Sequence, residues 1–171
     1  DYDPDAPRVG LQAAEALGWA PEQVFKTLMT LVDAKPVCVV VPSDCEVSMK
    51  KLAAAAGGKS AQMMKPADAE RLTGYRVGGV SPFGQKRPVP TVIDQAALGH
   101  AKVFVNGGQR GLQVRLAPSD LLAALPAKVA ITAALDTATA HRPSRGLTSS
   151  VAVAIWGVAV LMVAAPVLCG V

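Results

Sequence analysis

A glycine- and proline-rich stretch at residues 78–94, GGVSPFGQKRPVPTVID, carries the residue types best suited to binding an anion or a carbonyl. Glycine allows a positive φ and a close approach of the main chain to a ligand, whereas each proline fixes φ and removes a donor. The sequence therefore predicts a shaped loop, with Lys86 and Arg87 at its rim for an anionic backbone. The amides expected to face the ligand are those of Gly78, Gly79 and Ser81. The alternative is a long structural turn between two strands.

A lysine inside an apolar segment, Lys26 in VFKTL, is the second candidate for chemistry. Its ammonium group either reaches solvent along its aliphatic stem or points into a pocket. The neighbouring Thr27 either donates a hydroxyl hydrogen bond or is an ordinary strand residue. The pattern of residues leaves both pairs of alternatives open.

The other reactive side chains form no recognisable catalytic or metal-binding set. His100 and His141 have no partners at a useful spacing, so neither a Ser-His-Asp triad nor a Cys-His pair is indicated. Cys38, Cys45 and Cys169 lack CxxC spacing, which argues against zinc and a disulfide framework and favours reduced thiols in the cytoplasm. We expect no metal and no cofactor. A site without its own nucleophile must use water or a group on the substrate.

Composition predicts one domain with a substantial core, since 51% of the 171 residues are hydrophobic. The formal net charge of +4 fits contact with a nucleic acid but does not require it. Lys50, Lys51 and Lys59 either form a solvated face or contribute to an RNA site. Because the first residue is Asp1, we expect that an N-terminal piece is missing, and no signal peptide is visible in what remains.

Helical and strand patterns alternate irregularly along the chain. Helices are predicted at residues 7–17, 49–56, 66–73 and 118–124, and a helical turn from Pro21 runs into a strand. Further strands are predicted at residues 37–41, 75–77, 91–93, 102–105, 112–116 and 129–132. The first two strands pair as a hairpin across residues 33–36, and the glycine-rich turn at 106–111 joins antiparallel strands. This order predicts an α+β domain around a mixed or antiparallel sheet.

Three segments together resemble a known family: VFKTL, GYRVGGVSPFGQKRPVPTVID and NGGQRGLQVRLAPSDL, in this order and at these intervals. They are similar to the YbaK-type bacterial Cys-tRNA(Pro) deacylases, relatives of the editing domain inserted in some prolyl-tRNA synthetases. The resemblance covers about residues 1–133. It implies an α+β fold with a mixed, largely antiparallel curved sheet or β-barrel wrapped by short helices. It also implies a trans-editing enzyme that hydrolyses the ester of tRNA(Pro) mischarged with cysteine, with prolyl-tRNA synthetase as a partner.

The resemblance also assigns roles to residues of this chain. The catalytic positions are Lys26, Thr27, Gly78 and Gly79. The substrate-binding positions are Ser81, Pro82, Gly84, Gln85, Lys86 and Arg110. In this family the thiol of the cysteinyl ester is thought to displace the tRNA, which intramolecular attack would favour. Lys26 would then hold the aminoacyl group or the terminal ribose, and backbone amides at residues 78–81 would stabilise the oxyanion.

Two departures from the family pattern affect this transfer. Family members commonly have an acidic residue after the Arg-Gly-Leu turn and again two positions on, where this chain has Gln113 and Arg115. Strand alternation places both side chains on the face away from the core. The His-Asp-Pro of many relatives is Tyr2-Asp3-Pro4 here, and the opening helix before Asp1 is absent.

The composition changes after Thr132. Residues 134–150 are typical of a linker, and residues 151–168 are uncharged over a length of ~27 Å as a helix, near the thickness of a bilayer core. This segment is a candidate membrane span, a buried helix, or a non-native extension. Arg142 and Arg145 would keep the domain on the cytoplasmic side of the membrane if the segment inserts.

Two other functions are compatible with the sequence. One is a related deacylase for another small residue, such as Ala-tRNA(Pro), for which the substrate thiol would not be needed. The other is a catalytically inactive module that binds tRNA or a synthetase. Substitution of Lys26 and a comparison of the two esters would separate these possibilities.

Overall fold

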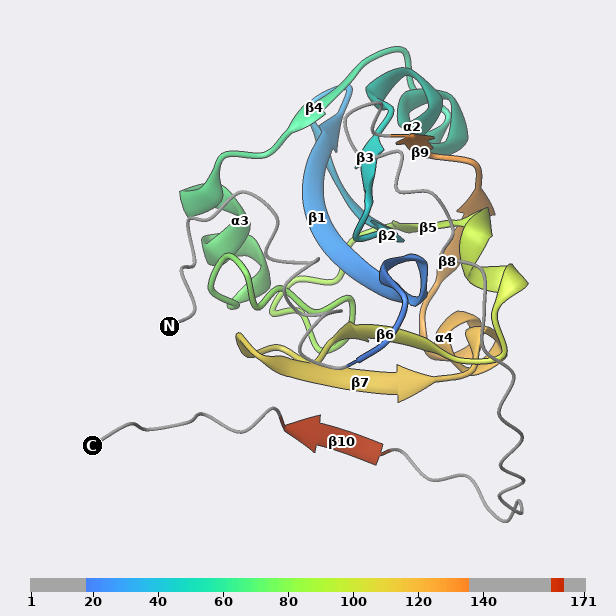
Figure 1. The fold of residues 1–171 in the computed structure, drawn as a ribbon. Helices are drawn as coiled ribbons and strands as arrows, with labels where there is room; N and C mark the ends of the chain where they lie inside the picture. Colours follow the sequence, from blue (N-terminus) through green and yellow to red (C-terminus); the bar gives the residue numbers. More distant parts are fainter. Residues whose placement is uncertain (1–17, 136–160, 165–171) are drawn as a thin grey trace.

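The central strand of the fold comes from the apolar segment that follows Pro21. A computed structural model of the chain describes residues 18–135 and 161–164 (Figure 1). The 3-10 helix η1 (Pro21–Gln23) leads directly into strand β1 (Val24–Val32), as the sequence predicted. The other strands are β2 (Lys35–Pro42), β3 (Cys45–Val47), β4 (Ala61–Met63), β5 (Thr91–Asp94), β6 (Val103–Asn106), β7 (Leu112–Leu116), β8 (Ala127–Ala130), β9 (Ala133–Leu135) and β10 (Leu161–Ala164). The helices are α2 (Met49–Ala56), α3 (Pro66–Thr73) and α4 (Pro118–Ala124), with a second 3-10 helix, η2 (Gln95–Gly99).

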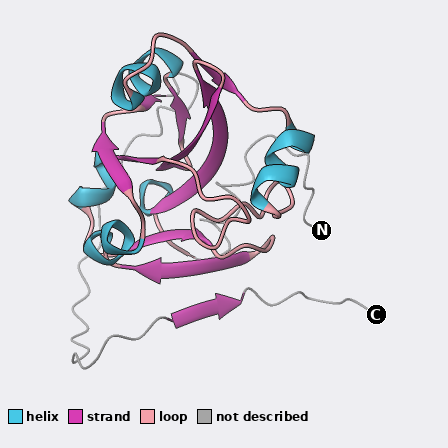
Figure 2. Ribbon diagram, turned by 180° about the vertical axis from the view of Figure 1, so that it is seen from behind, coloured by secondary structure: helices cyan, strands magenta, loops and turns pink. Residues whose placement is uncertain are grey.

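The main sheet is mixed and curved, which confirms the predicted fold class. Its strand order is β10-β7-β6-β1-β2-β5-β8, with β4 on β1, and β3 pairs with β9 in a separate ribbon. Pairs β1–β2, β1–β4, β6–β7 and β7–β10 are antiparallel, whereas β1–β6, β2–β5 and β5–β8 are parallel. Strand β1 bends strongly, and helices α2, α3 and α4 lie at different places around the sheet (Figures 1 and 2).

The β1–β2 hairpin is closed by a two-residue turn. Asp33 and Ala34 have φ values of 46° and 65°, as the tight turns that match the twist of paired strands require. The Asp33 carboxylate accepts hydrogen bonds from the amides of Lys59 and Ser60, both at 2.9 Å. These contacts fasten the segment before β4 to the hairpin.

Each face of the sheet covers its own hydrophobic cluster. Alternate residues of β1 contribute to opposite clusters: Phe25 and Met29 to one, Leu28 and Val32 to the other. The first cluster also contains Val80 from the long loop between α3 and β5. The loop is therefore packed against one face of β1.

Three predicted helix boundaries are confirmed by their capping residues. The Ser48 hydroxyl accepts the amide of Lys51 at 3.4 Å, and Gly57 ends α2 in the left-handed conformation. Gly74 ends α3 in the same way, with φ of 81°. Left-handed Gly74 turns the chain sharply into the long loop.

Several predicted strands differ from those observed. Residues 75–77 form a turn instead of a strand, because the Arg76 carbonyl accepts the Gly79 amide at 2.9 Å and reverses the chain. The strand predicted at 129–132 lies at Ala127–Ala130. The three-residue strands β3, β4 and β9 were not predicted. Because β9 pairs with β3, the sheet structure extends two residues past the boundary predicted at residue 133.

The predicted tail is described only in part. Within residues 151–168, predicted as a helix, the structure describes residues 161–164, and these form strand β10 antiparallel to β7. The helix predicted at 7–17 and the linker from 136 to 150 lie outside the described residues. Among the residues that are described, no helix has the length and apolar character needed to cross a membrane.

Candidate functional site

The ladder of β1 is interrupted on one side. Along one edge, β1 pairs with β2 from Phe25 to Val32. Along the other edge, β6 pairs only with Val24 and Phe25, and β4 begins at Thr30. Between these two pairings, neither β6 nor β4 pairs with residues 26–28. Backbone groups at such a break can bind a loop or a ligand.

Lys26 lies at this break, on the face of β1 that carries Leu28 and Val32. The side chain is half-buried, and its Nζ donates to the Ser43 carbonyl at 3.4 Å. Ser43 is buried, and its hydroxyl has no hydrogen-bond partner. The ammonium is therefore held next to a desolvated polar group.

Asn106 and Gln113 come to the same face from the neighbouring strands. They are directly paired in the β6–β7 register, and Asn106 follows the β6 residue that pairs with Phe25. Gln113 is 7% exposed, and its Oε1 has no hydrogen-bond partner among the residues that the structure describes. As predicted, Gln113 points away from the cluster that contains Val114, but it is buried there. An unpartnered buried amide oxygen is costly, so this position is suited to an incoming donor.

Thr27 points to the opposite face of β1. It is paired with Val40, which belongs to the same cluster as Val80 of the loop. Thr27 is 8% exposed and its Oγ1 also lacks a hydrogen-bond partner. The break in the ladder thus has an unpartnered polar atom on each face.

The loop between α3 and β5 satisfies its own polar side chains. The Ser81 hydroxyl accepts the Phe83 amide at 3.1 Å, and the Gln85 amide group donates to the Ser81 carbonyl at 3.0 Å. Gln85 also lies near Cys38 Sγ at 3.6 Å and Met29 Sδ at 3.9 Å, which ties the loop to β2 and β1. Both side chains are buried, so the structure places them in the scaffold of the loop.

The two glycines at the start of the loop have different surroundings. Gly78 has φ of 85°, and its carbonyl accepts the Asn106 side-chain amide at 3.2 Å, which fixes the loop to the end of β6. The Gly79 amide already donates to the Arg76 carbonyl at 2.9 Å, so it is not available for an oxyanion in this conformation. A Cβ on Gly79 would lie 2.9 Å from the Arg110 amide, so this glycine allows the two loops to touch. Gly78 and Ser81 remain of the three predicted amides.

The remaining predicted positions lie at the surface or support the loop. Pro82 is buried, whereas Gly84 and Lys86 are exposed. Gly84 has φ of 60° and lies under the Tyr75 hydroxyl, which donates to the Phe83 carbonyl at 2.8 Å. Lys86 and Arg87 run beside the end of α3 and face solvent.

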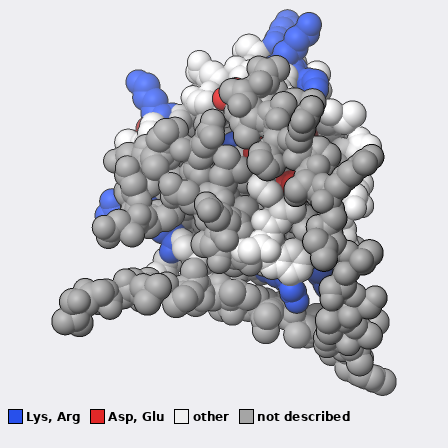
Figure 3. Space-filling view, in the orientation of Figure 1, with Lys and Arg blue, Asp and Glu red and all other residues white. Residues whose placement is uncertain are grey.

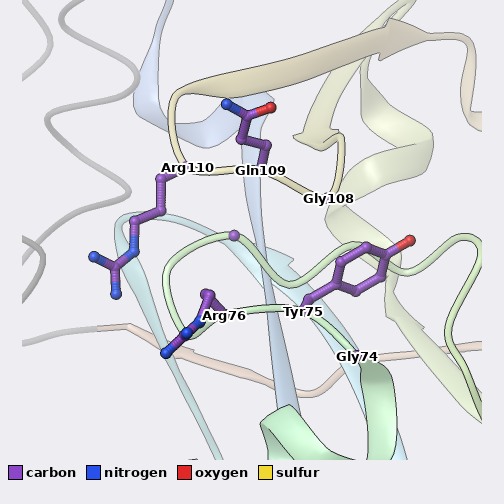
Figure 4. Close-up of a pocket in the computed structure, with 7 residues that line it drawn as sticks. Gly74, Tyr75, Arg76, Gly108, Gln109 and Arg110 are labelled. Carbon is purple, nitrogen blue, oxygen red and sulfur yellow. The ribbon is translucent and has the colours of Figure 1, made fainter.

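Arg110 belongs to a separate hollow on the outer side of the loop. Its exposed side chain donates through Nε to the Val77 carbonyl at 2.9 Å. The pocket, of about 410 Å³, is lined by Gly74, Tyr75, Arg76, Gly79, Gly108, Gln109 and Arg110 (Figure 4). Lys26 is not among these lining residues, so the structure separates the strand break from the arginine pocket.

Two residues near the break were missed or misjudged in the sequence. Asn106 was treated only as part of a turn, yet it holds Gly78 with its amide group and accepts the Gly108 amide at 2.8 Å. An Asn before two glycines is a signal for such a turn, but not for its second contact. Ser43 carried no sequence signal, because its role depends on the position of Lys26.

Burial keeps the two described thiols protonated. Burial raises the pKa of Cys38 to about 11, partly offset by hydrogen bonds from Gln85 and Thr91. Burial and the adjacent Asp44 raise the pKa of Cys45 to about 11, although Lys26 opposes the shift. Neither group supplies a thiolate at neutral pH. In the described ranges, no three or more His, Cys, Asp and Glu side chains are grouped as a metal site would need.

Residues 4–124 match the family described as the aminoacyl-tRNA editing domain. The chain belongs to this family. The match covers the strand break, the loop and the arginine pocket, and it confirms the family resemblance read from the three motifs. The predicted class of enzyme, an aminoacyl-tRNA deacylase, agrees with this family.

Relatives with informative names include a protein named as a deacylase and several proline–tRNA ligases. The chain is 41% identical over 110 residues to a protein of Enterococcus faecalis named as a Cys-tRNA(Pro)/Cys-tRNA(Cys) deacylase, EbsC, covering 64% of this chain and 67% of that protein. It is 30% identical over 94 residues to a proline–tRNA ligase of Acidithiobacillus ferrooxidans, covering 55% of this chain but 16% of the ligase. The chain thus spans about a sixth of such ligases.

The fold also matches a solved structure. A crystal structure described as a trans-editing enzyme for prolyl-tRNA synthetase superposes with a TM-score of 0.68 at 30% identity. The superposition covers 74% of this chain and 80% of that one. The mixed curved sheet is therefore the fold of this family of editing domains.

Proposed function

We propose that the protein is a trans-editing deacylase that hydrolyses the ester bond of Cys-tRNA(Pro). The observation that carries the proposal is the strand break at residues 26–28, where Lys26 and Asn106 lie on the same face of neighbouring strands and Asn106 anchors the loop at Gly78. Support also comes from the similarity to a protein named as a deacylase of this kind and to a segment of proline–tRNA ligases. We further propose that the protein acts in the cytoplasm and receives its tRNA from prolyl-tRNA synthetase.

In the proposed reaction, the nucleophile comes from the substrate. The cysteinyl sulfur attacks the ester carbonyl carbon, the bond from that carbon to the ribose oxygen breaks, and the thiol proton passes to the ribose oxygen. Water then opens the resulting thiolactone to cysteine. Intramolecular attack gains a large effective molarity, and the protonated state of Cys38 and Cys45 is consistent with a nucleophile from elsewhere.

The protein's part in this reaction is to bind and orient the aminoacyl end. Lys26 contacts the carbonyl or the terminal ribose, and the amides of Gly78 and Ser81 stabilise the oxyanion. The unpartnered oxygen of Gln113, on the same face as Lys26, accepts a donor from the substrate, such as the aminoacyl ammonium or a ribose hydroxyl, whereas Thr27 lies on the opposite face of the break, next to the loop cluster. These roles use the break in the ladder as the binding site.

The test is single-turnover hydrolysis of Cys-tRNA(Pro) and Ala-tRNA(Pro) by the full chain and by Lys26→Ala. We expect the cysteinyl ester to be cleaved selectively, and Lys26→Ala to slow cleavage by at least about 100-fold, as for loss of a group that stabilises a transition state. Lys35→Ala is the matched control, because Lys35 is exposed at the far end of the same hairpin. It should leave the rate unchanged.

Two results would contradict the proposal. Equal cleavage of the alanyl ester would show that the thiol is not needed and would favour a deacylase for small residues. Failure of the folded parent to cleave either ester, with tRNA binding retained, would leave a binding module.

A further inference from the structure

The arginine pocket is built from two loops that are far apart in the sequence. The turn after α3 supplies residues 74–79, and the β6–β7 turn supplies residues 108–110. Gly79 lets the backbones touch, and Arg110 Nε donates to the Val77 carbonyl at 2.9 Å. The Tyr75 ring packs on Gly108, where a Cβ would come within 2.8 Å of the ring. These contacts hold the pocket in one shape.

Two arginines give the pocket its charge. Arg76 and Arg110 come from facing loops and extend to the same side in Figure 4. The Arg76 side chain is 84% exposed and lies 4.0 Å from Glu70, the one carboxylate found near it among the described residues. Glu70 already accepts the Val77 amide with its other oxygen at 2.9 Å. Both guanidinium groups therefore retain donors that can bind an oxyanion.

Further cations extend from the pocket along the same side of the loop. Lys86 lies next to Gly74, at 3.5 Å from the position of a Cβ on that glycine, and Arg87 follows it. Both are exposed, and neither forms an ion pair with a described acid. Lys and Arg side chains project at several separate places around the outline of the molecule (Figure 3). The cations at residues 76, 86, 87 and 110 are instead brought together by the loop contacts.

We propose that this pocket binds a backbone phosphate of the substrate tRNA, with Arg76 and Arg110 as its ligands. Planar guanidinium forks match phosphate oxygens, and about 410 Å³ is enough for one nucleotide unit with its ribose against Tyr75. Lys86 and Arg87 contact the next phosphates. The same loop carries Gly78 at the strand break, so RNA bound here delivers its 3′ end to that site. The inference rests on the proposed function for the identity of the RNA.

The test measures binding of uncharged tRNA to the full chain as a function of salt, for the parent and for Arg76→Gln/Arg110→Gln. We expect weaker binding by about tenfold or more, and a decrease of roughly 1.4–1.8 in the slope of log K against log salt, since each arginine–phosphate ion pair contributes about 0.7–0.9. Lys102→Gln/Lys128→Gln removes the same charge from two exposed lysines outside the pocket. This control should change neither quantity by as much.

The single variant Arg76→Gln shows whether a loss of binding comes from the lost charge or from a change in the shape of the pocket. Arg110 holds the Val77 carbonyl, whereas Arg76 uses only its backbone to hold Gly79, so this single variant keeps the contacts between the loops. We expect the slope to fall by about 0.7–0.9 with an unchanged thermal midpoint. Equal losses in the lysine control, or no loss in either arginine variant, would overturn the proposal.

Hydrolysis assays separate this inference from the proposed function. Cleavage of 3′-cysteinyl-adenosine, which lacks the RNA backbone, should be unaffected by the arginine variants, while kcat/KM for Cys-tRNA(Pro) falls. A parent that binds tRNA through the two arginines but cleaves neither ester would remove the proposed function and leave the phosphate site intact. Cleavage of Cys-tRNA(Pro) that is insensitive to both arginines would remove the phosphate site alone.

Discussion

The loop at residues 78–87 and the break in the β1 ladder are neighbours, but they treat their polar groups in opposite ways. In the loop, Ser81 and Gln85 are buried and hydrogen-bonded to the loop itself. At the break, Thr27 and Gln113 are equally buried, and an oxygen of each has no partner. Unpaired buried oxygens lower stability, whereas internally paired groups keep a loop in shape. The difference fits the proposal that the loop is the scaffold and that substrate binds at the break.

The sequence motifs alone pointed to the loop, and not to the strands, as the source of the substrate-binding side chains. The loop carries the more conspicuous composition, so most predicted substrate-binding residues were placed there. In the structure the Ser81 and Gln85 side chains are hydrogen-bonded within the loop, and their contact with the substrate stays a prediction. We propose that the loop supplies a fixed backbone shape and that the strands supply side chains that contact the substrate.

The largest effect on stability is expected at Asp94. Its buried carboxylate is fully hydrogen-bonded, in contrast to the unpartnered oxygens at the break. Its carboxylate accepts the amides of Ala96 at 2.9 Å, Thr132 at 2.7 Å and Ala133 at 2.7 Å. Burial alone would raise the pKa of Asp94, but these hydrogen bonds hold it below the ordinary value of 3.8. We expect Asp94→Asn to lower the free energy of unfolding by about 2–3 kcal/mol, as for bonds to a buried charge.

The same carboxylate gives a pH dependence of known sign. Because the pKa is lower in the folded state, the stabilisation is complete at neutral pH and is lost as the pH falls below about 4 through the folded pKa. Urea unfolding at neutral and acid pH should show this decline in the parent and a smaller one in Asp94→Asn. Asp120→Asn, at an exposed carboxylate, is the control. An equal loss of unfolding free energy in Asp94→Asn and Asp120→Asn would mean that the hydrogen bonds to the Asp94 carboxylate do not contribute to stability.

The second prediction concerns the scaffold role of the loop. Gln85→Leu removes the donor to the Ser81 carbonyl while keeping a side chain of similar size against Met29 and Cys38. We expect a loss of about 1–2 kcal/mol in unfolding free energy, because the buried carbonyl loses its partner. Cleavage of 3′-cysteinyl-adenosine by the folded fraction should stay within about threefold of the parent. Gln95→Leu, at an exposed glutamine, should leave both quantities unchanged.

Gln85→Leu can also contradict the contrast between a structural loop and a substrate-binding strand break. A stable Gln85→Leu protein with a large loss of turnover would place Gln85 in contact with the substrate, as the family resemblance predicted. The loop would then contribute side-chain chemistry after all.

Local signals were enough to predict most elements, because their causes are local. Ser48 and Gly57 cap α2, and the two-residue turn at Asp33 and Ala34 closes the hairpin. Lys26 was found as a charged residue in an apolar strand. These features depend on residues within a few positions of one another.

The features that were missed depend on long-range pairing. Gln113 is buried because of how β7 packs in the sheet, and its pairing with Asn106 follows from the β6–β7 register. The break in the ladder exists only because β6 ends and β4 begins at different points along β1. The turn at 75–77 is closed by the Arg76–Gly79 hydrogen bond and is also held by contacts with the distant β6–β7 turn. No local sequence pattern reports such relations.

The third prediction concerns the buried side-chain oxygen of Gln113, which has no hydrogen-bond partner among the described residues. Gln113→Leu should leave stability within about 0.5 kcal/mol or increase it, because a buried oxygen without a partner is removed. If that oxygen binds the substrate, kcat/KM for Cys-tRNA(Pro) should fall by about tenfold. Gln62→Leu, at an exposed glutamine of β4, is the control. A loss of stability without a loss of activity would make Gln113 a structural residue.

The smallest effects are expected from a matched pair of threonines on β1. Thr30 donates its hydroxyl to the Val37 carbonyl at 2.8 Å, whereas the hydroxyl of Thr27 has no partner. Thr30→Val should therefore lower the unfolding free energy by about 1 kcal/mol with activity preserved, and Thr27→Val should raise it by up to about 1 kcal/mol. Urea unfolding and single-turnover hydrolysis measure the two quantities on the same samples. Because both substitutions exchange a hydroxyl for a methyl on one strand, the sign of the difference reports only whether the hydroxyl was paired. If Thr27→Val is as destabilising as Thr30→Val, the break holds no unsatisfied donor or acceptor on that face, and the binding role falls to Lys26 and Gln113 alone.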